Sequence, residues 1–85
     1  MGGVEADVRR VIRRFFPEAY IRRVEDSRYV GYYVYPGRNF VYDEAKRLEA
    51  FLPPGSRVFP NPRLHVIFIH VKKRGEPEGP AVYVF

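Results

Sequence analysis

The sequence predicts a single α+β domain spanning residues 1–85, with two helices packed on one face of an antiparallel sheet of about five strands. Three observations predict this class. Two segments carry apolar residues at helical spacing, the remaining segments are short and rich in Tyr, Val and Ile, and Gly and Pro fall between them. The predicted order is α-β-β-(β)-α-β-β-β, where the strand in parentheses is optional. An 85-residue chain is near the size at which one core can just hold a fold.

The first helix is predicted over residues 4–16. Apolar side chains recur there at the i, i+4, i+7, i+8, i+11 spacing of one helical face, and Pro17 ends the pattern: Val4, Val8, Val11, Ile12 and Phe15. The opposite side carries a stripe of four arginines, Arg9, Arg10, Arg13 and Arg14. This stripe is either the solvated side of an amphipathic helix or a surface that contacts phosphates.

Residues 19–35 predict two strands joined by a polar turn at Glu25–Arg28. Pro36-Gly37 then gives the pattern of a type II turn. This turn either closes a second hairpin or leads to a helix that begins between Asn39 and Asp43, and we favour the helix. Both alternatives place residues 43–52 in a helix with a common apolar line, formed by Val41, Ala45, Leu48 and Leu52.

Three further strands are predicted after the second helix, at residues 56–59, 63–73 and 81–85, with a turn at Pro60-Asn61-Pro62 and a polar, Gly/Pro-rich connector over residues 73–80. Both alternating sets of Leu64–Val71 are apolar. This pattern is typical of a central strand that is covered on both faces.

Composition bounds the function classes. The net charge of +5 and the pI of about 9.8 favour an acidic partner such as nucleic acid. The chain has no Cys, which excludes thiolate chemistry and suits a reducing interior, and its N-terminal residues do not have the pattern of a secretion signal. No apolar run approaches the roughly 20 residues needed to span a bilayer. We therefore expect a cytoplasmic protein without a membrane partner.

The basic residues of this chain are mostly arginine, which has an explanation other than nucleic-acid binding. The chain has 12 Arg against 3 Lys, no Thr, no Gln and eight Pro. Few thermolabile side chains and proline-stiffened loops are typical of thermophilic proteins. The arginine content can therefore reflect the host as well as a binding function.

Two helices cover only one face of such a sheet, so the composition of the second face matters. A two-residue turn at Asp26-Ser27 would pair Arg22 with Gly31, whereas a three-residue turn would place Arg23 opposite Gly31. In the first case one face carries Tyr20, Arg22, Tyr29, Gly31, Tyr33 and Tyr35, and the other carries Ala19, Ile21, Val30, Tyr32 and Val34. If residues 36–42 also fold back, Phe40 and Tyr42 join the tyrosine-rich face.

This face suggests a surface for unpaired nucleotides. Aromatic rings stack on bases, arginine contacts phosphate, and a glycine leaves room for close approach. The predicted nucleic-acid-binding residues are the six of the face together with Arg38 and the four helix arginines: Tyr20, Arg22, Tyr29, Gly31, Tyr33, Tyr35, Arg38, Arg9, Arg10, Arg13 and Arg14. The alternative is that the rings fill the core, or are buried in a homodimer or another protein interface.

No catalytic or cofactor chemistry is predicted. His65 and His70, the two histidines, are expected to point to opposite faces of one strand, which prevents joint metal binding. Neither serine has an adjacent base, and the acidic pairs Glu25-Asp26 and Asp43-Glu44 fit turn and helix-cap positions. We expect no enzyme activity, no metal and no small-molecule cofactor.

Overall fold

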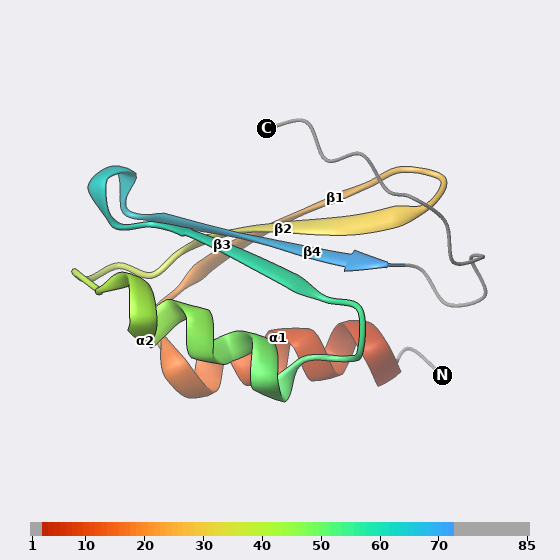
Figure 1. Ribbon diagram of the computed structural model, residues 1–85, viewed down its shortest axis with the longest axis horizontal. Helices are drawn as coiled ribbons and strands as arrows, with labels where there is room; N and C mark the ends of the chain where they lie inside the picture. The colour runs from red at the N-terminus through yellow and green to blue at the C-terminus, as the bar shows by residue number, and fades with distance from the viewer. Residues whose placement is uncertain (1–2, 73–85) are drawn as a thin grey trace.

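The structure is a computed structural model that describes residues 3–72. Its helices and strands follow in the order α1 (Gly3–Phe15), β1 (Tyr20–Glu25), β2 (Tyr29–Tyr35), α2 (Tyr42–Lys46), the 3-10 helix η1 (Arg47–Phe51), β3 (Arg57–Asn61), the 3-10 helix η2 (Pro62–Leu64) and β4 (Val66–Lys72). The strands form one antiparallel sheet in the order β1-β2-β4-β3, and α1 and α2 lie on the same side of it (Figure 1).

The predicted α+β class and antiparallel sheet are confirmed, but the described residues form four strands, not five. The strand predicted at residues 81–85 and the connector predicted at residues 73–80 lie outside the described residues. The optional strand after Pro36-Gly37 does not form, and residues 36–41 are a loop instead. Gly37 has φ +80° there, as the third residue of a type II turn requires.

Of the apolar face predicted for α1, Val8 and Ile12 belong to the core, Val11 and Phe15 are partly buried, and Phe16, which was not predicted on that face, is buried as well. Val8 and Ile12 are fully buried, and the amide of Phe16 donates to the carbonyl of Ile12 at 2.8 Å. Pro17 then lacks the amide that a further turn would need. The helix layer therefore packs on the sheet through aliphatic side chains and Phe16.

The register of the β1–β2 hairpin differs from both predictions. Asp26 and Tyr29 are joined through their backbones, so the two-residue turn consists of Ser27 and Arg28. The carboxylate of Asp26 accepts hydrogen bonds from the amides of Arg28 and Tyr29, both at 2.7 Å, which fixes the turn one residue later than expected. Val24, and not an arginine, lies opposite Gly31.

The second helical segment begins at Tyr42, within the predicted interval, and continues as η1. Ala45, Leu48 and Leu52 are buried as predicted, whereas Val41 is 65% exposed and does not join them. Phe40 is buried and meets Phe16 edge-on at 6.0 Å between ring centroids. Phe40 therefore belongs to the core, and its predicted alternative place on the second sheet face is wrong.

β4 is the central strand predicted from its apolar pattern, since it pairs with β2 on one side and β3 on the other. Ile67, Ile69 and Val71 point toward the helices and are almost completely buried. The strand begins later than predicted, because η2 precedes it and His65 adopts a left-handed conformation with φ 55°. Only His70 lies in the strand, so the prediction that both histidines share one strand is wrong.

Candidate nucleic-acid interface

The sheet face that points away from the helices gathers aromatic and basic side chains from all four strands. Strand alternation and the observed registers define this aromatic face: Tyr20, Arg22 and Val24 on β1; Tyr29, Gly31, Tyr33 and Tyr35 on β2; Phe68, His70 and Lys72 on β4; Arg57 and Phe59 on β3. The six residues predicted to share a face do share it. The structure adds the residues of β3 and β4.

The rings of this face are in contact across the strands. Tyr33 and Phe68 have centroids 4.8 Å apart, and Phe68 and Phe59 are stacked at 6.4 Å. Tyr29 lies against His70 at 4.2 Å, and Tyr20 lies near Tyr35 at 6.1 Å. The face is therefore a platform of neighbouring rings and not a set of isolated ones.

Several of these rings remain accessible. The exposed fractions are 66% for Tyr20, 40% for Tyr35 and 37% for both Tyr33 and Phe59. Tyr29 and Phe68 are half-buried. The core, by contrast, takes Tyr32 from the opposite side of β2, where it is 1% exposed. Strand alternation thus separates a core tyrosine from the surface tyrosines, and Tyr33 and Tyr35 are not core residues.

Gly31 does not offer open backbone to a ligand. It is buried, and a Cβ placed on it would stand 2.9 Å from Cζ of Phe68 and 3.0 Å from Cγ2 of Val24. The space that the glycine leaves is filled by the Phe68 ring. Because Gly31 has no side chain, the ring of Phe68 can pack over it and contact the ring of Tyr33.

Two arginines of the aromatic face have unengaged guanidinium groups. Within residues 3–72, neither Arg22 nor Arg57 makes a hydrogen bond or an ion pair, and both are exposed. The charge of Arg57 makes only the last-ranked contribution to the lowered pKa of the Glu49 carboxyl. Arg22 lies opposite Tyr33 on the neighbouring strand, and Arg57 is two residues before Phe59 on β3. Because β1 and β3 are the outer strands of the described sheet, these two charges stand on opposite sides of the ring platform.

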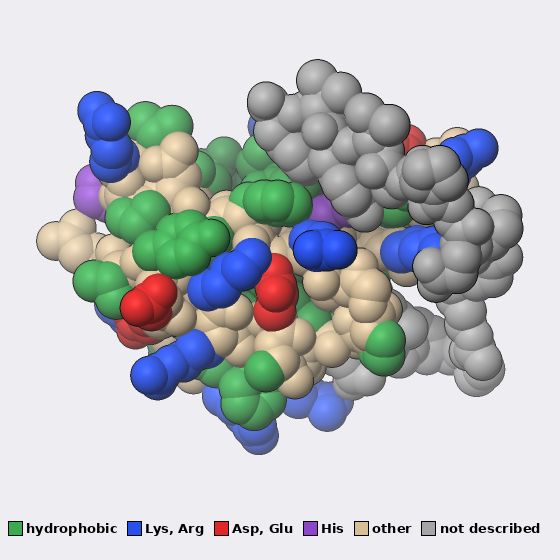
Figure 2. All heavy atoms as spheres, viewed as in Figure 1, with side chains coloured by type: hydrophobic (Ala, Val, Ile, Leu, Met, Phe, Trp, Pro, Cys, Tyr) green, Lys and Arg blue, Asp and Glu red, His purple; other side chains and the backbone are tan. Residues whose placement is uncertain are grey.

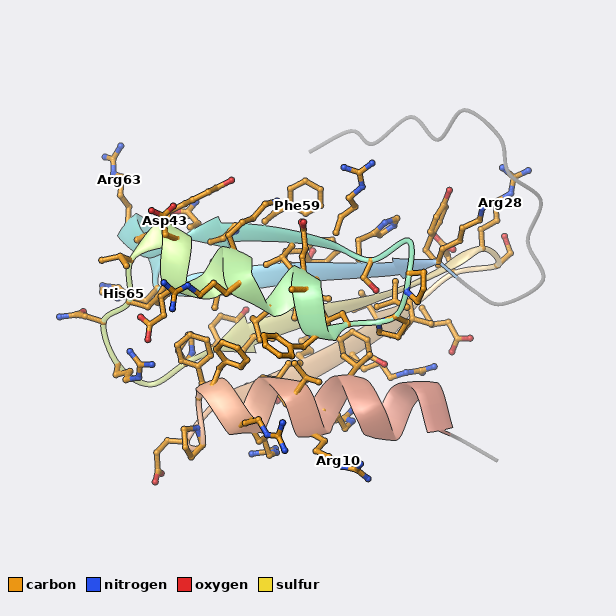
Figure 3. All side chains as sticks on the ribbon, turned by 60° about the horizontal axis from the view of Figure 1, so that its bottom comes forward. Arg10, Arg28, Asp43, Phe59, Arg63 and His65 are labelled. Atoms are coloured by element: carbon orange, nitrogen blue, oxygen red, sulfur yellow. The ribbon has the colours of Figure 1, made fainter. Side chains whose placement is uncertain are left out.

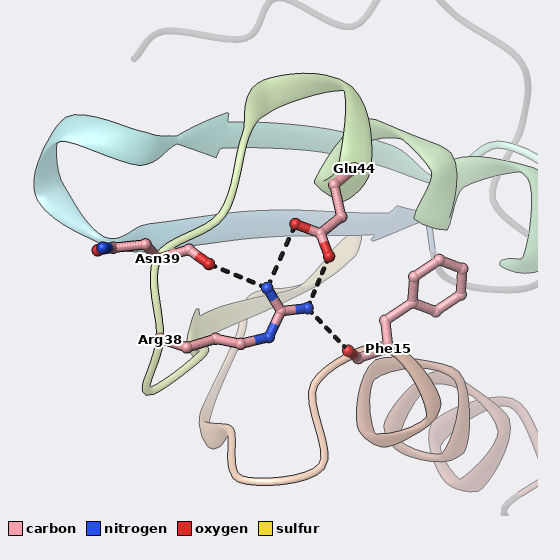
Figure 4. A network of polar contacts seen from close by, with 4 residues as sticks. All are labelled: Phe15, Arg38, Asn39 and Glu44. Atoms are coloured by element: carbon pink, nitrogen blue, oxygen red, sulfur yellow. Dashed lines mark hydrogen bonds and ion pairs between the residues drawn. The ribbon is translucent and has the colours of Figure 1, made fainter.

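Arg38 has a different environment from the one its prediction as a binding residue assumed. Its guanidinium donates to Glu44 at 2.6 and 3.3 Å, to the carbonyl of Phe15 at 3.3 Å and to the carbonyl of Asn39 at 2.9 Å (Figure 4). It also lies 4.5 Å from the centroid of the Phe16 ring. The hydrogen bonds from Arg38 lower the pKa of the Glu44 carboxyl, and those to Glu44 raise the pKa of Arg38. Arg38 joins the end of α1 to α2.

The helix arginines are not brought to the aromatic face. Figure 3 shows Arg10 on the outer side of α1 and Phe59 on the far side of the sheet, so the helix layer and the sheet lie between them. Arg13 donates to the carbonyl of Ala19 at 3.2 Å, and Arg10, Arg13 and Arg14 are exposed. Arg9 is partly buried on the same helix. The four helix arginines, predicted to bind nucleic acid together with the tyrosine-rich face, therefore do not lie beside it.

On the side of the molecule that Figure 2 shows, basic side chains are interspersed with hydrophobic and acidic ones. The candidate site is therefore defined by the aromatic rings of the sheet face together with the guanidinium groups beside them.

Sequence reasoning did not assign Phe59, Phe68, His70 and Arg57 to this face. Their alternation within each strand was visible, but the pairing of β2 with β4 joins residues some forty positions apart in the chain. No local pattern specifies that pairing.

His70 is 9% exposed on the aromatic face. Burial lowers the pKa of its imidazole, and the charge of Asp26 opposes this shift only in part, so the imidazole is neutral near neutral pH.

Residues 3–72 contain no group of three His, Cys, Asp or Glu side chains arranged to hold a metal ion. The same residues include no helix long and apolar enough to cross a membrane. Comparison with protein-family models, with curated proteins and with solved structures found no match to this chain.

Proposed function

We propose that the protein binds single-stranded nucleic acid, RNA or DNA, on the aromatic face of its sheet. One observation carries the proposal: Tyr33, Tyr35 and Phe59 are 37–40% exposed on the sheet face that the helices do not cover, and Arg22 and Arg57 stand beside them with unengaged guanidinium groups. Unstacked bases present flat faces to such rings, and their phosphates accept hydrogen bonds from arginine.

The energies are sufficient for useful affinity. Stacking of a base on an aromatic side chain contributes about 1–3 kcal/mol, so three rings contribute roughly 3–9 kcal/mol before ordering costs. Micromolar affinity corresponds to about −8 kcal/mol. Two phosphate contacts therefore bring the total into that range, with binding that weakens as salt rises.

A duplex is a poorer ligand for this surface. Paired bases are stacked on one another, so their faces are not available to Tyr33 or Phe59. The α1 arginines do not extend this surface, because α1 lies in the helix layer and Arg10 is on the other side of the molecule from Phe59 (Figure 3). The proposal therefore includes a preference for unpaired strands.

The test measures binding of fluorescent single-stranded RNA and DNA oligonucleotides by anisotropy at low salt. Tyr33→Ala should weaken binding by about 5- to 150-fold, the equivalent of one stacked base. Tyr42→Ala is the matched control, because Tyr42 is 50% exposed but lies on α2 in the helix layer. Wild-type protein that binds no oligonucleotide would end the proposal.

A homodimer through the same face is the second candidate. The centre of the face is aromatic and its unengaged arginines are at its sides, which is also the anatomy of protein interfaces. Light scattering distinguishes the two. Two chains of 10.0 kDa give about 20 kDa, and Tyr33→Ala should then yield a 10.0 kDa monomer. A wild-type monomer at high concentration would exclude this candidate.

A further inference from the structure

The rings of the aromatic face form a continuous series across the strands. Arg22, Tyr33, Phe68 and Phe59 are register partners on β1, β2, β4 and β3 in turn. Contacts of 4.8 Å and 6.4 Å between ring centroids join Tyr33 to Phe68 and Phe68 to Phe59. The series therefore runs perpendicular to the strands, over a width of roughly 14 Å for four strands spaced about 4.8 Å apart.

A path along β2 is interrupted. Tyr35 and Tyr33 are followed on the same face by Gly31, which has no side chain and is buried beneath Phe68. Tyr29, the next residue of that row, is half-buried against the ring of His70 at 4.2 Å. A strand that followed β2 would leave its exposed tyrosines after two residues.

The charges have the same orientation as the ring series. Arg22 is on the outer strand β1, and Arg57 is on the outer strand β3 beside Phe59. A backbone that crosses the sheet meets one unengaged guanidinium on each side of the rings. A backbone that runs along β2 has Arg22 beside the exposed rings of Tyr33 and Tyr35, and it meets Arg28 and Lys72 only at the far end of the strand, past buried Gly31 and half-buried Tyr29.

We propose that an unpaired strand crosses the aromatic face perpendicular to the β-strands, with one base on Tyr33, one base on Phe59, and phosphates bound by Arg22 and Arg57. Phe68 fills the space between the two bases and supports both rings from the side. This inference rests on the proposed function, because it specifies the path of the ligand on that face.

The decisive comparison is Phe59→Ala against Tyr35→Ala, with single-stranded RNA and DNA oligonucleotides as separate probes. The two side chains are 37% and 40% exposed, so they offer similar areas for stacking. A crossing path predicts a loss of about 5- to 150-fold for Phe59→Ala and less than about 3-fold for Tyr35→Ala. A path along β2 predicts the reverse, and that result would overturn the inference while leaving the proposed function intact.

The arginines give a second measurement that does not depend on a ring. Each phosphate contact on a single strand contributes about 0.7 to the slope of log K against log salt concentration. Arg57→Gln and Arg22→Gln should each reduce that slope by about 0.7, and Arg14→Gln on α1 should leave it unchanged. If Arg57→Gln behaves like Arg14→Gln, the strand does not reach β3 and the crossing path is wrong. If Phe59→Ala fails to fold, this comparison decides alone.

Failure of the two proposals can be told apart. Absence of oligonucleotide binding by the wild-type protein rejects the proposed function itself. Binding that depends on Tyr33 and Tyr35, but not on Phe59 or Arg57, rejects only the crossing path. RNA and DNA probes that bind alike place the recognition in bases and phosphates, whereas a preference for RNA adds a contact to the 2′-hydroxyl.

Discussion

The ring of Phe68 occupies the space that Gly31 leaves: a Cβ on the glycine would stand 2.9 Å from Cζ of that ring. Gly31 is an extended strand residue, paired with Val24 and His70, and it is not among the residues with positive φ. Backbone freedom is therefore not the reason for glycine at this position. Glycine is needed here because it leaves space for the Phe68 ring, and the continuity of the aromatic face depends on that ring.

Gly31→Ala should destabilise the fold by about 1–3 kcal/mol, because the added methyl must displace Phe68 or Val24. Reduced chain entropy in the unfolded state offsets up to roughly 1 kcal/mol of this cost. The measurement is urea denaturation of Gly31→Ala, Phe68→Leu and the double variant. The smaller side chain should relieve the clash, so we expect a coupling free energy of about 0.5–3 kcal/mol. A stabilised single variant would contradict this account.

The sequence was sufficient to separate the faces of β2 and insufficient to place its partners. A two-residue turn that shifts by one position, from Asp26-Ser27 to Ser27-Arg28, keeps the parity of the pairing. Tyr20, Arg22 and Tyr33 therefore stay on the predicted face although every predicted partner changes. The turn position depends on hydrogen bonds from two amides to the Asp26 carboxylate, which alternation alone does not reveal.

Long-range contacts set the remaining limits of prediction. Whether a surface arginine binds a ligand depends on what folding brings to it. Arg38 donates hydrogen bonds to Glu44 and to the carbonyl of Phe15, which is 23 residues away in the sequence. Among the described residues, Arg22 donates to neither a carboxylate nor a carbonyl. In the sequence the two arginines look alike, since each lies two or three residues after a tyrosine. Only the tertiary structure distinguishes the structural one from the available one.

Glu49 and Lys46 cap the outer edge of β3. The carboxylate of Glu49 accepts from the Val58 amide at 2.8 Å, Lys46 donates to the Val58 carbonyl at 2.8 Å, and the two side chains are joined at 2.6 Å. These bonds satisfy edge groups that would otherwise be open to another strand. Glu49→Gln should cost about 1 kcal/mol in urea denaturation at neutral pH. Glu18→Gln, which changes an exposed glutamate outside the cluster, should cost much less.

The same cluster predicts acid sensitivity. Burial raises the pKa of Glu49, but hydrogen bonds from Lys46 and the Val58 amide outweigh it, so the pKa lies below its usual value. A folded-state pKa below the unfolded one gives stability that is present above about pH 4.3 and is lost as the pH falls through the folded value. Wild-type protein should therefore lose more unfolding free energy between about pH 5 and pH 3 than Glu49→Gln does. Equal losses in the two proteins would contradict the assignment.

His70 predicts a second pH dependence at higher pH. Burial beside Tyr29 and Phe68 lowers the pKa of the imidazole, and the charge of Asp26 opposes this only in part. As the pH falls, the imidazole is protonated in the unfolded chain at a higher pH than in the folded protein. The free energy of unfolding is therefore highest above about pH 6.5 and declines as the pH falls from there toward the folded pKa. His70→Phe keeps a ring in place and should remove this decline. His65→Asn, at an exposed left-handed position, should retain it.

Arg38→Lys tests whether Arg38 is a structural or a binding residue. Lysine cannot donate to both oxygens of Glu44 and to the carbonyls of Phe15 and Asn39 at once, because it lacks the planar fork of guanidinium. We expect a lower thermal midpoint and a Glu44 pKa closer to its usual value, which makes the stability less sensitive to acid.

Arg14→Lys, on the exposed side of α1, is the control and should leave the thermal midpoint almost unchanged. Oligonucleotide affinity and its salt slope should be the same in Arg38→Lys as in the wild type at temperatures where both are folded. A lysine variant that keeps its thermal midpoint but loses oligonucleotide affinity would return Arg38 to the binding surface. The guanidinium is already committed to Glu44 and two carbonyls, so we expect the opposite pattern.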